Sequence, residues 1–300
     1  MDRSSIGTRM KSYEDAQKTY LTRRMPVMIR VDGNAFHTFT RGFERPFDST
    51  MAESMQRTMK YMCENISGCV LGYTQSDEIT LLLIDYKKKN QGAWFGYVKR
   101  KVETIAASMA TMAFNEAFLD VITEEKEVTE ETEKVSATES EEETEKVKDY
   151  YFKYVKKCGR AMFDARAFNI PEFEVVNEFI WRQQDCTRNS IQSVGHANFS
   201  DKKMHKKNMS QIQDMLMLKK GINWNDFPTF LKRGSCCIKE DYFIPENELP
   251  ENHRNNLSPR TLDPEEDEYG VWRSRWIIDK EIPIFTQNKN YVNDLFLNKH

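Results

Sequence analysis

Residues 68–84 constrain the fold more than any other stretch, because two apolar runs stand on either side of a short polar connection. The runs at residues 68–73 and 78–86 have the length and composition of strands, and the connection is short enough for a tight hairpin. The sequence therefore predicts an antiparallel hairpin. Asp77 and Glu78 stand at its tip.

Helical and strand-like segments surround this hairpin in a regular order. A buried strand rich in Val, Ile and Met is predicted before it, and a helix with the capping-box spacing of Thr50 and Glu53 lies between. A second helix and another strand follow. The order β-α-β-β-α-β is the split pattern of ferredoxin-like sheets, so we predict an α+β fold with a ferredoxin-type antiparallel sheet and packed helices. The flanking segments are residues 25–32, 48–66, 98–118 and 161–168.

A long helix is predicted at residues 171–198, because Pro171 fits a first helical turn and apolar residues recur at helical spacing. Projection at about 100° per residue places Arg182, Asp185 and Asn189 opposite the apolar stripe. This helix opens a predicted C-terminal helical extension. The stripe is Val176, Ile180, Ile191 and Val194, and the later elements are a helix at 210–220, a turn and strand at 232–239 and a strand at 272–278.

Negative charge is concentrated in one segment. The chain has a formal net charge of −3, but residues 124–146 hold eleven Glu, three Lys and no aromatic residue. Such a segment cannot bury enough apolar surface to offset the entropy of ordering, so we expect a solvated or loosely helical insertion. A regulatory role, such as imitation of a nucleic acid, is the alternative. The rest of the chain carries about +5, which permits a polyanionic partner.

The six Cys form no CxxC pair and no cluster with zinc-binding spacing. The sequence has neither an apolar signal segment nor a run of about 18 apolar residues, so no membrane span is predicted. Free thiols in a reducing cytoplasm are the expected state. Cys236 and Cys237 are adjacent, so a redox role is an alternative to simple burial.

Asp32, which ends the first predicted strand, forms with Asp77 the pair that bears most on function. Mg²⁺ takes oxygen ligands and is held by one or two carboxylates together with substrate phosphates. Two such ions can clamp the attacking and leaving oxygens of a phosphoryl transfer. Two carboxylates about 4 Å apart repel by roughly 4 kcal/mol at intermediate dielectric, and a cation relieves this repulsion. The alternative makes each Asp a turn residue with a local hydrogen bond.

Three cationic side chains are candidates for phosphate contacts. His37 follows Asp32 by five residues, and Arg45 and Lys101 lie further along the chain. Their ordinary alternatives are a partly exposed structural His and two solvated surface charges. The chain has neither a GxGxxG nor a GxxxxGKS/T motif, so neither a dinucleotide-binding nor a Walker-type site is supported.

Six short motifs, in this order, resemble those of the tRNA(His) guanylyltransferase family. The resemblance extends over about residues 10–240 and is stronger to its bacterial and archaeal "like" proteins, which are 3′-to-5′ polymerases that repair tRNA 5′ ends. The acidic insertion and the last sixty residues are not covered. The motifs are Arg30-Val-Asp-Gly-Asn-Ala-Phe-His37, Arg45-Pro-Phe-Asp48, Gly72-Tyr-Thr-Gln-Ser-Asp-Glu78, Phe163-Asp-Ala-Arg166, Trp181-Arg-Gln-Gln-Asp-Cys186 and Lys232-Arg-Gly234.

The resemblance implies a catalytic domain related to the palm of polymerases and nucleotidyl cyclases. It implies two Mg²⁺ ions on Asp32, Asp77 and the Gly33 carbonyl, with Glu78 as a further catalytic residue beside them. ATP and GTP are the implied nucleotide substrates. The implied nucleotide-binding positions are Asn34, Ala35, Phe36, His37, Arg45, Ser76 and Lys101, and the implied RNA-binding positions are Arg182, Arg188 and Asn189.

The implied reaction has two nucleotidyl-transfer steps, for which the protein mainly positions reactants and neutralises charge. First, the 5′-monophosphate of a tRNA attacks the α-phosphorus of ATP or GTP and releases pyrophosphate. The 3′-hydroxyl of an incoming nucleotide then attacks the activated 5′ end. The resemblance also implies a homotetramer whose subunits share the tRNA.

On this interpretation, residues 1–122 are the first part of the palm catalytic domain and residues 123–147 are the flexible acidic insertion. Residues 148–240 complete the catalytic domain and add a helical region for tRNA or subunit contacts. Residues 241–300, rich in Asn, Pro and charge, are a C-terminal extension that we expect to wrap the surface around one strand.

One position departs from the family's pattern. In eukaryotic members a His after Asp-Cys helps to read the histidine anticodon, whereas Thr187 follows Cys186 here. By projection Thr187 lies on the apolar stripe, so we expect it to pack. The sequence thus favours template-dependent repair of several tRNAs. The alternatives are a dedicated tRNA(His) guanylyltransferase that adds an untemplated G, a palm-fold nucleotidyl cyclase, and an RNA-binding scaffold, against which the intact Asp32 and Asp77 speak.

Overall fold

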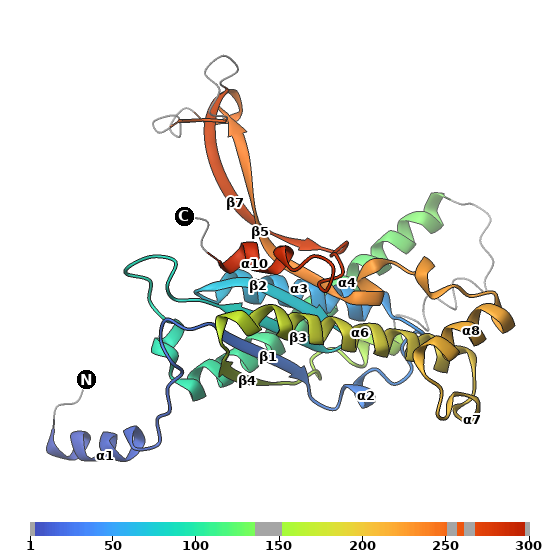
Figure 1. Cartoon of the computed structure of the whole chain (residues 1–300), viewed down its shortest axis with the longest axis horizontal. Coiled ribbons are helices and arrows are strands. Elements are labelled where there is room, and N and C mark those ends of the chain that lie inside the picture. Colours follow the sequence, from blue (N-terminus) through green and yellow to red (C-terminus); the bar gives the residue numbers. More distant parts are fainter. Residues whose placement is uncertain (1–3, 136–151, 251–256, 261–267, 298–300) are drawn as a thin grey trace.

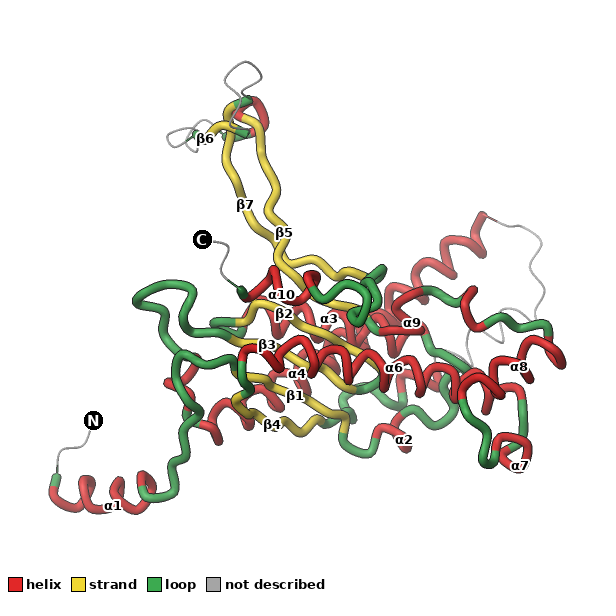
Figure 2. Tube along the Cα trace, in the orientation of Figure 1, coloured by secondary structure: helices red, strands yellow, loops and turns green. Residues whose placement is uncertain are grey.

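The computed structural model describes residues 4–135, 152–250, 257–260 and 268–297. Its strands form one antiparallel sheet in the order β4-β1-β3-β2-β5-β7-β6, with helices on both faces (Figures 1 and 2). The strands are β1 Val27–Gly33, β2 Cys69–Gln75, β3 Glu78–Leu83, β4 Phe163–Asn169, β5 Ser235–Pro245, β6 Ser258–Pro259 and β7 Tyr269–Asp279. The helices are α1 Ser5–Asp15, α2 Phe36–Phe39, α3 Ser49–Asn65, α4 Lys99–Val135, α6 Val175–Asn198, α7 Asp201–Met204, α8 Met209–Lys220, α9 Thr229–Arg233 and α10 Asn290–Phe296.

The first four strands have the connectivity that the sequence predicts. Helix α3 links β1 to β2, β2 and β3 form the hairpin, and α4 leads from β3 toward β4. All pairs in the order β4-β1-β3-β2 are antiparallel. The predicted α+β fold with an antiparallel sheet is therefore confirmed.

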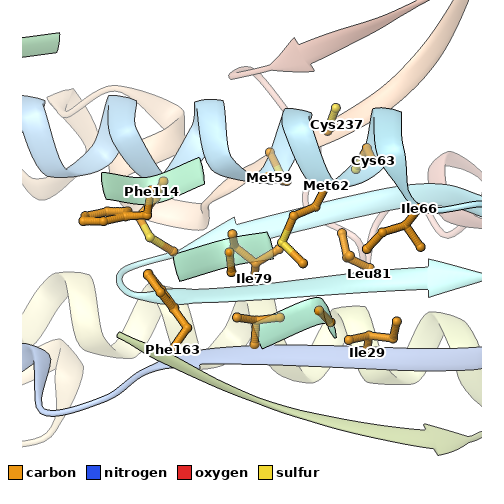
Figure 3. Packing of buried hydrophobic residues seen from close by; sticks show 14 of the residues in the cluster. Ile29, Met59, Met62, Cys63, Ile66, Ile79, Leu81, Phe114, Phe163 and Cys237 are labelled. Atoms are coloured by element: carbon orange, nitrogen blue, oxygen red, sulfur yellow. The ribbon is translucent and has the colours of Figure 1, made fainter. Parts of the chain in front are cut away.

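Successive side chains of a strand point to opposite sides of the sheet. In the central strands consecutive residues are apolar, so both faces of the sheet are apolar. Ile29 and Leu81 lie in one core, with Met59 from α3 and Phe114 from α4 (Figure 3). The other face packs against α6, α10 and the segment before α10. That second core includes Met28, Leu71, Leu82, Phe179, Phe285 and Phe296. The sheet is thus held from both sides, which fixes the positions of its strand ends.

Helix α3 starts earlier than the capping-box spacing predicts, so that detail is wrong. Asp48 is the N-cap, and its Oδ1 accepts a hydrogen bond from the Met51 N–H at 2.9 Å. Thr50 therefore lies inside the first turn, where it is buried and its hydroxyl donates to Glu125 Oε2 at 3.1 Å. Asp48 also accepts a hydrogen bond from the Tyr154 hydroxyl, which ties this end of α3 to a distant segment.

Helix α4 continues past its predicted end at residue 118 and takes in the first part of the acidic segment. It runs to Val135. Glu124 accepts hydrogen bonds from Arg57 Nη1 and Nη2 at 2.8 and 2.6 Å, which joins this acidic turn to α3. The rest of the predicted insertion, residues 136–147, lies outside the described residues.

Within the described part of the chain, one helical stretch, Lys99–Lys126 of α4, is long and apolar enough to cross a membrane. Its Ala106, Ala110, Phe114 and Phe118 side chains are fully buried in the core beside the sheet. These side chains of the helix pack inside the protein, whereas Met112 and Leu119 of the same stretch are exposed.

The C-terminal extension differs from the predicted surface wrap. β5 and β7 pair antiparallel as two eleven-residue strands, and their outer part projects from the body as an arm (Figure 1). The strand predicted at residues 272–278 is therefore part of a longer strand that extends the sheet. Helix α10 then packs against the body, with Phe296 buried in the second core.

Gly33 ends β1 at a point with no room for a side chain. A Cβ there would lie 2.3 Å from Phe36 Cδ2, and the Phe36 ring packs against Phe114 and Phe163. We expect Gly33→Ala to lower the free energy of unfolding by about 1–3 kcal/mol, the usual cost of overpacking. Thermal or urea unfolding measures this. Gly92→Ala is the control, because nothing lies within 4 Å of its added Cβ; equal stability of the two variants contradicts the prediction.

Candidate active site

The β1 strand and the β2–β3 hairpin bring Asp32 and Asp77 to one edge of the sheet. Asp32 stands opposite Glu78 in the register of β1 and β3. The next residue, Gly33, donates its N–H to the Asp77 carbonyl oxygen at 3.0 Å. The two acidic strand ends recognised in the sequence are therefore neighbours in space.

Three carboxylates form a row at this edge. Asp32 lies between Glu78 on β3 and Asp164 on β4, and directly opposed residues of neighbouring antiparallel strands share a face. Like charges in this arrangement repel each other. Arg166 Nη2 lies 4.0 Å from Asp32 Oδ2 and 3.4 Å from Asp164 Oδ1, which offsets part of the repulsion. Sequence reasoning missed Asp164 and Arg166 as site residues, although both belong to a motif that carries the family resemblance.

The environment of Asp77 and Glu78 disfavours their charged forms. Burial raises the pKa of Asp77, the Asp32 charge raises it further, and a hydrogen bond from Ser76 Oγ, 3.0 Å from Asp77 Oδ1, opposes these effects. Burial also raises the pKa of Glu78, against the attraction of Arg182 and Arg30. A cation beside such carboxylates favours their charged form.

The predicted nucleotide-binding positions at this edge divide into exposed and buried side chains. Asn34, Ala35, His37 and Ser76 are exposed, and Ala35 and Ser76 have positive φ angles of 54° and 51° in the two turns. Phe36 is only 4% exposed and packs in the core. For Phe36, only the backbone is therefore available to a ligand.

A cavity of about 190 Å³ lies next to Ser76. Its walls come from the start of α3, the end of β2 and the middle of α6. Arg45 is exposed immediately before Pro46, which lines the cavity. An apolar wall with a few polar groups is typical of sites for small organic ligands. The lining includes Phe47, Met55, Thr74, Asn189, Ser190 and Ser235.

Lys101 is not brought to this edge within the chain. The Thr111 hydroxyl of α4 accepts a hydrogen bond from the N–H of Phe163 at 3.1 Å, and Phe163 is the β4 partner of Gly33. Lys101 precedes Thr111 by ten residues, or about 15 Å along a helix axis. Its triphosphate role stays a prediction that this arrangement does not favour.

Arg182 of helix α6 has a different environment from the one that the helical projection of the sequence suggests. The Arg182 side chain is 6% exposed, and its Nε lies 2.8 Å from Glu78 Oε1. Its Nη2 donates to Asp185 Oδ2 at 2.6 Å. The side of α6 opposite the predicted apolar stripe is therefore buried at Arg182, because α6 packs against the sheet on one side and against α8 and α9 on others. Arg188, whose side chain is 55% exposed, and half-buried Asn189 remain accessible for RNA contacts.

Thr187 does not pack in the apolar stripe, so that expectation is also wrong. It is partly exposed and lines a groove of about 620 Å³. Trp181, Arg188 and Arg233 line the same groove. The position that departs from the family's pattern thus faces a groove that combines two arginines with aromatic surface.

The donor atoms at the edge fit Mg²⁺ better than a soft metal. Among residues 4–135, 152–250, 257–260 and 268–297, no group of three or more His, Cys, Asp or Glu gathers as a metal site. Asp32 and Asp77 supply two carboxylates and Gly33 a backbone carbonyl, and Mg²⁺ usually completes its shell with water and substrate phosphates. Cys236 and Cys237 are fully buried in β5, and burial raises the pKa of Cys236, as expected for structural thiols.

Comparison with known proteins decides the family. The family model for tRNAHis guanylyltransferase matches residues 7–171, more than half of the chain. The chain belongs to this family. Its members are nucleotidyltransferases, so the chain is an enzyme of that class.

Relatives extend over most of the chain's length. A tRNA(His) guanylyltransferase of Schizosaccharomyces pombe is 25% identical over 232 residues, covering 71% of this chain and 73% of the relative. An uncharacterized protein of Acanthamoeba polyphaga mimivirus is 30% identical over 245 residues, covering 78% and 77%.

Solved structures are similar over nearly the whole chain. A bacterial tRNA(His) guanylyltransferase-like protein in complex with ATP has a TM-score of 0.73 and 38% identity over 98% of this chain and 100% of that chain. The corresponding GTP complex has a TM-score of 0.69 and 35% identity with the same coverage. The β5–β7 arm and the C-terminal helix therefore lie within the part of the chain that has structural counterparts.

The raised pKa of Asp77 predicts that this catalytic candidate costs stability. A carboxyl group whose pKa is higher in the folded than in the unfolded state destabilises the folded protein at neutral pH, and the cost fades as pH falls through the raised pKa. We expect Asp77→Asn to raise Tm at pH 7 in EDTA and to abolish nucleotidyl transfer. The gain in Tm shrinks toward acidic pH. Asp241→Asn, at an exposed carboxylate of the arm, is the control; a fall in Tm for Asp77→Asn at pH 7 contradicts the prediction.

Proposed function

We propose that this protein is a template-dependent 3′-to-5′ nucleotidyltransferase that activates a tRNA 5′-monophosphate with ATP or GTP and then adds nucleotides to the 5′ end. The observation that carries the proposal is the meeting of Asp32 and Asp77 at a sheet edge beside an exposed turn and a cavity. We infer that this sheet is a palm like that of polymerases and cyclases. Residues 148–240 then complete the catalytic domain and provide the tRNA-facing helices.

In this proposal Asp32, Asp77 and the Gly33 carbonyl hold two Mg²⁺ ions. When bound, the ions supply charge neutralisation at the attacking and leaving oxygens of each transfer. The residues themselves fix where the reacting phosphate sits, because the Gly33–Asp77 backbone hydrogen bond sets the spacing of the two strand ends. Arg166, which is half-exposed, adds a positive charge beside Asp32 and Asp164.

Nucleotide binding is assigned to the exposed turn and the adjoining cavity. Ser76, His37 and Arg45 present polar or cationic groups suited to phosphates, and the cavity walls offer apolar surface to a base. The complexes of the bacterial relative with ATP and with GTP support the use of both nucleotides. Arg45 presents a planar fork of donors, which suits two phosphate oxygens at once.

The tRNA is assigned to the groove along α6 and to the helical lobe that follows it, which consists of α7, α8 and α9. Thr187 and Arg188 line this groove, and Asn189 of the same helix lines the cavity next to Ser76. The sequence Lys-Lys-Met-His-Lys-Lys continues the tRNA path at residues 202–207, where the four Lys are exposed and Met204 is buried in a separate small core with Val194 of α6 and Leu216 of α8. These positive charges favour contact with a phosphate backbone.

Templated addition is favoured over histidine-specific addition because of Thr187. Single-stranded RNA is read through hydrogen bonds to base edges and stacking on aromatic or guanidinium planes. Thr187 offers one hydroxyl at the position where eukaryotic members carry a His. Base pairing with the opposite strand of the acceptor stem then supplies the selection. By the same resemblance we propose a cytoplasmic homotetramer.

The decisive experiment uses several 5′-monophosphorylated tRNAs that each lack the first nucleotide. Each is incubated with the protein, Mg²⁺, ATP and one NTP at a time. We expect the added nucleotide to follow the opposing template base on every tRNA. Asp32→Ala and Asp77→Ala are expected to lose both activation and addition.

Three outcomes would point elsewhere. Activity restricted to tRNA(His), lost when the anticodon is changed and adding G opposite any base, identifies a dedicated tRNA(His) guanylyltransferase. A cyclic nucleotide formed without RNA identifies a cyclase. RNA binding without nucleotide transfer by the wild type identifies a scaffold.

The lysines of α7 provide a separate test of the tRNA path. Lys202→Gln/Lys203→Gln is expected to weaken tRNA binding and to reduce the slope of log K against log salt by about 0.7–0.9 for each lost phosphate contact. Filter binding from 50 to 200 mM salt measures the slope. The matched control is Lys88→Gln/Lys89→Gln, at exposed lysines in a loop at the opposite end of the molecule (Figure 1). Equal slopes for both double variants contradict this path.

A further inference from the structure

Arg182 is a buried cation in contact with the catalytic hairpin. Its side chain is 6% exposed, and its Nε lies 2.8 Å from Glu78 Oε1 without pointing a proton at it, so the contact is an ion pair. On the other side its Nη2 donates to Asp185 Oδ2 at 2.6 Å. Its guanidinium also lies 4.3 Å from the centre of the Trp181 ring. These contacts leave no open face for a substrate.

The position of Glu78 makes this partner consequential. Glu78 follows Asp77 directly and stands opposite Asp32, and its side chain is 13% exposed. A buried carboxylate without a paired cation is strongly unfavourable. Unpaired, Glu78 would repel Asp32 across the strands or turn away, and either change would move the tip of the hairpin. A cation fixed on α6 prevents both.

We infer that Arg182 is a positioning residue that holds Glu78, and with it the tip of the β2–β3 hairpin, in the geometry that Asp32 and Asp77 require. Asp185 fixes Arg182 from the other side, and the Asp185 Oδ1 atom accepts a hydrogen bond from exposed Arg188. A continuous chain of charges therefore joins the groove to the catalytic edge. The inference rests on the proposed function and replaces the direct RNA contact that sequence reasoning gave Arg182.

The first test separates positioning from RNA contact by steady-state kinetics and RNA binding. We expect Arg182→Met to lower kcat for nucleotide addition about 10- to 100-fold, as for other residues that orient catalytic groups. The Kd for 5′-phosphorylated tRNA stays within about twofold, and Arg182→Lys, which keeps the charge without the fork, recovers part of kcat. Arg188→Met raises the tRNA Kd.

The control is Arg57, which resembles Arg182 in chemistry but not in place. Arg57 lies on α3 and pairs with Glu53 and Glu124, at 3.1 and 2.6 Å. We expect Arg57→Met to lower Tm and to keep kcat within about twofold of wild type. A loss of kcat in Arg57→Met equal to that in Arg182→Met would mean that any broken ion-pair network impairs the enzyme, which overturns the inference. A raised tRNA Kd with normal kcat in Arg182→Met overturns it as well.

The second test needs no activity. Arg182→Met is expected to lower Tm because it removes the cation that Glu78 and Asp185 share, which leaves Glu78 only the attraction of Arg30 and Asp185 only Arg188. Adding Glu78→Gln to Arg182→Met should raise the Tm of that variant and so recover part of the loss. The same substitution in the wild-type protein should raise Tm by less than this amount. Strictly additive Tm changes would show that the two side chains are not coupled. If the wild-type protein transfers no nucleotide, the proposed function fails, while this comparison still decides whether Arg182 holds Glu78.

Discussion

Repulsion among carboxylates at one sheet edge is the interaction to which the rest of the structure responds. The strand register places Asp32 between Glu78 and Asp164, and the hairpin turn places Asp77 beside it. Glu78 and Asp164 each have an Arg within 3.4 Å, whereas Asp32 shares Arg166 at 4.0 Å. Within the described residues no Arg, Lys or His lies within ion-pair distance of Asp77. The protein therefore neutralises the outer members of the group, and in the proposed function an external cation neutralises Asp32 and Asp77.

This edge is held by apolar packing, which no charge at the edge could replace. Both faces of the central strands are covered, by α3 and α4 on one side and α6 and α10 on the other. Carboxylates with raised pKa values lower the stability of the folded state at neutral pH. Apolar packing in the two cores must supply the stability that offsets this loss and keeps the strand ends in register. The contact between Gly33 and the Phe36 ring is where core and edge meet, because one residue ends the strand and the other begins the packed helix.

The sequence predicted local structure well and tertiary environment poorly, for a physical reason. Each apolar pattern that predicted the hairpin, its neighbouring strands and α3 lies within one short segment of the sequence. The environment of Arg182 depends on which elements surround α6, and a projection with one buried stripe fails for a helix that is covered on several sides. The row with Asp164 depends on the register of β1 with β4. The extent of the arm depends on the register of β5 with β7, which are separate segments of the sequence, and on cross-strand contacts such as that of Phe243 with Trp272.

In the proposed function, the layout of the chain separates the chemistry from the selection of the nucleotide. The catalytic edge stands on the sheet, whereas Arg188, Thr187 and the lysines of residues 202–207 belong to α6 and a helical lobe with its own core. Groups that hold a phosphate backbone tolerate any sequence, because phosphates carry no base identity. In the proposed function, a lobe of this kind presents many tRNAs to the edge, and the opposing strand of the RNA decides which nucleotide fits. Histidine-specific addition would instead require a base-reading group at position 187, where Thr187 itself contributes one hydroxyl to a groove that Arg188, Arg233 and Trp181 also line.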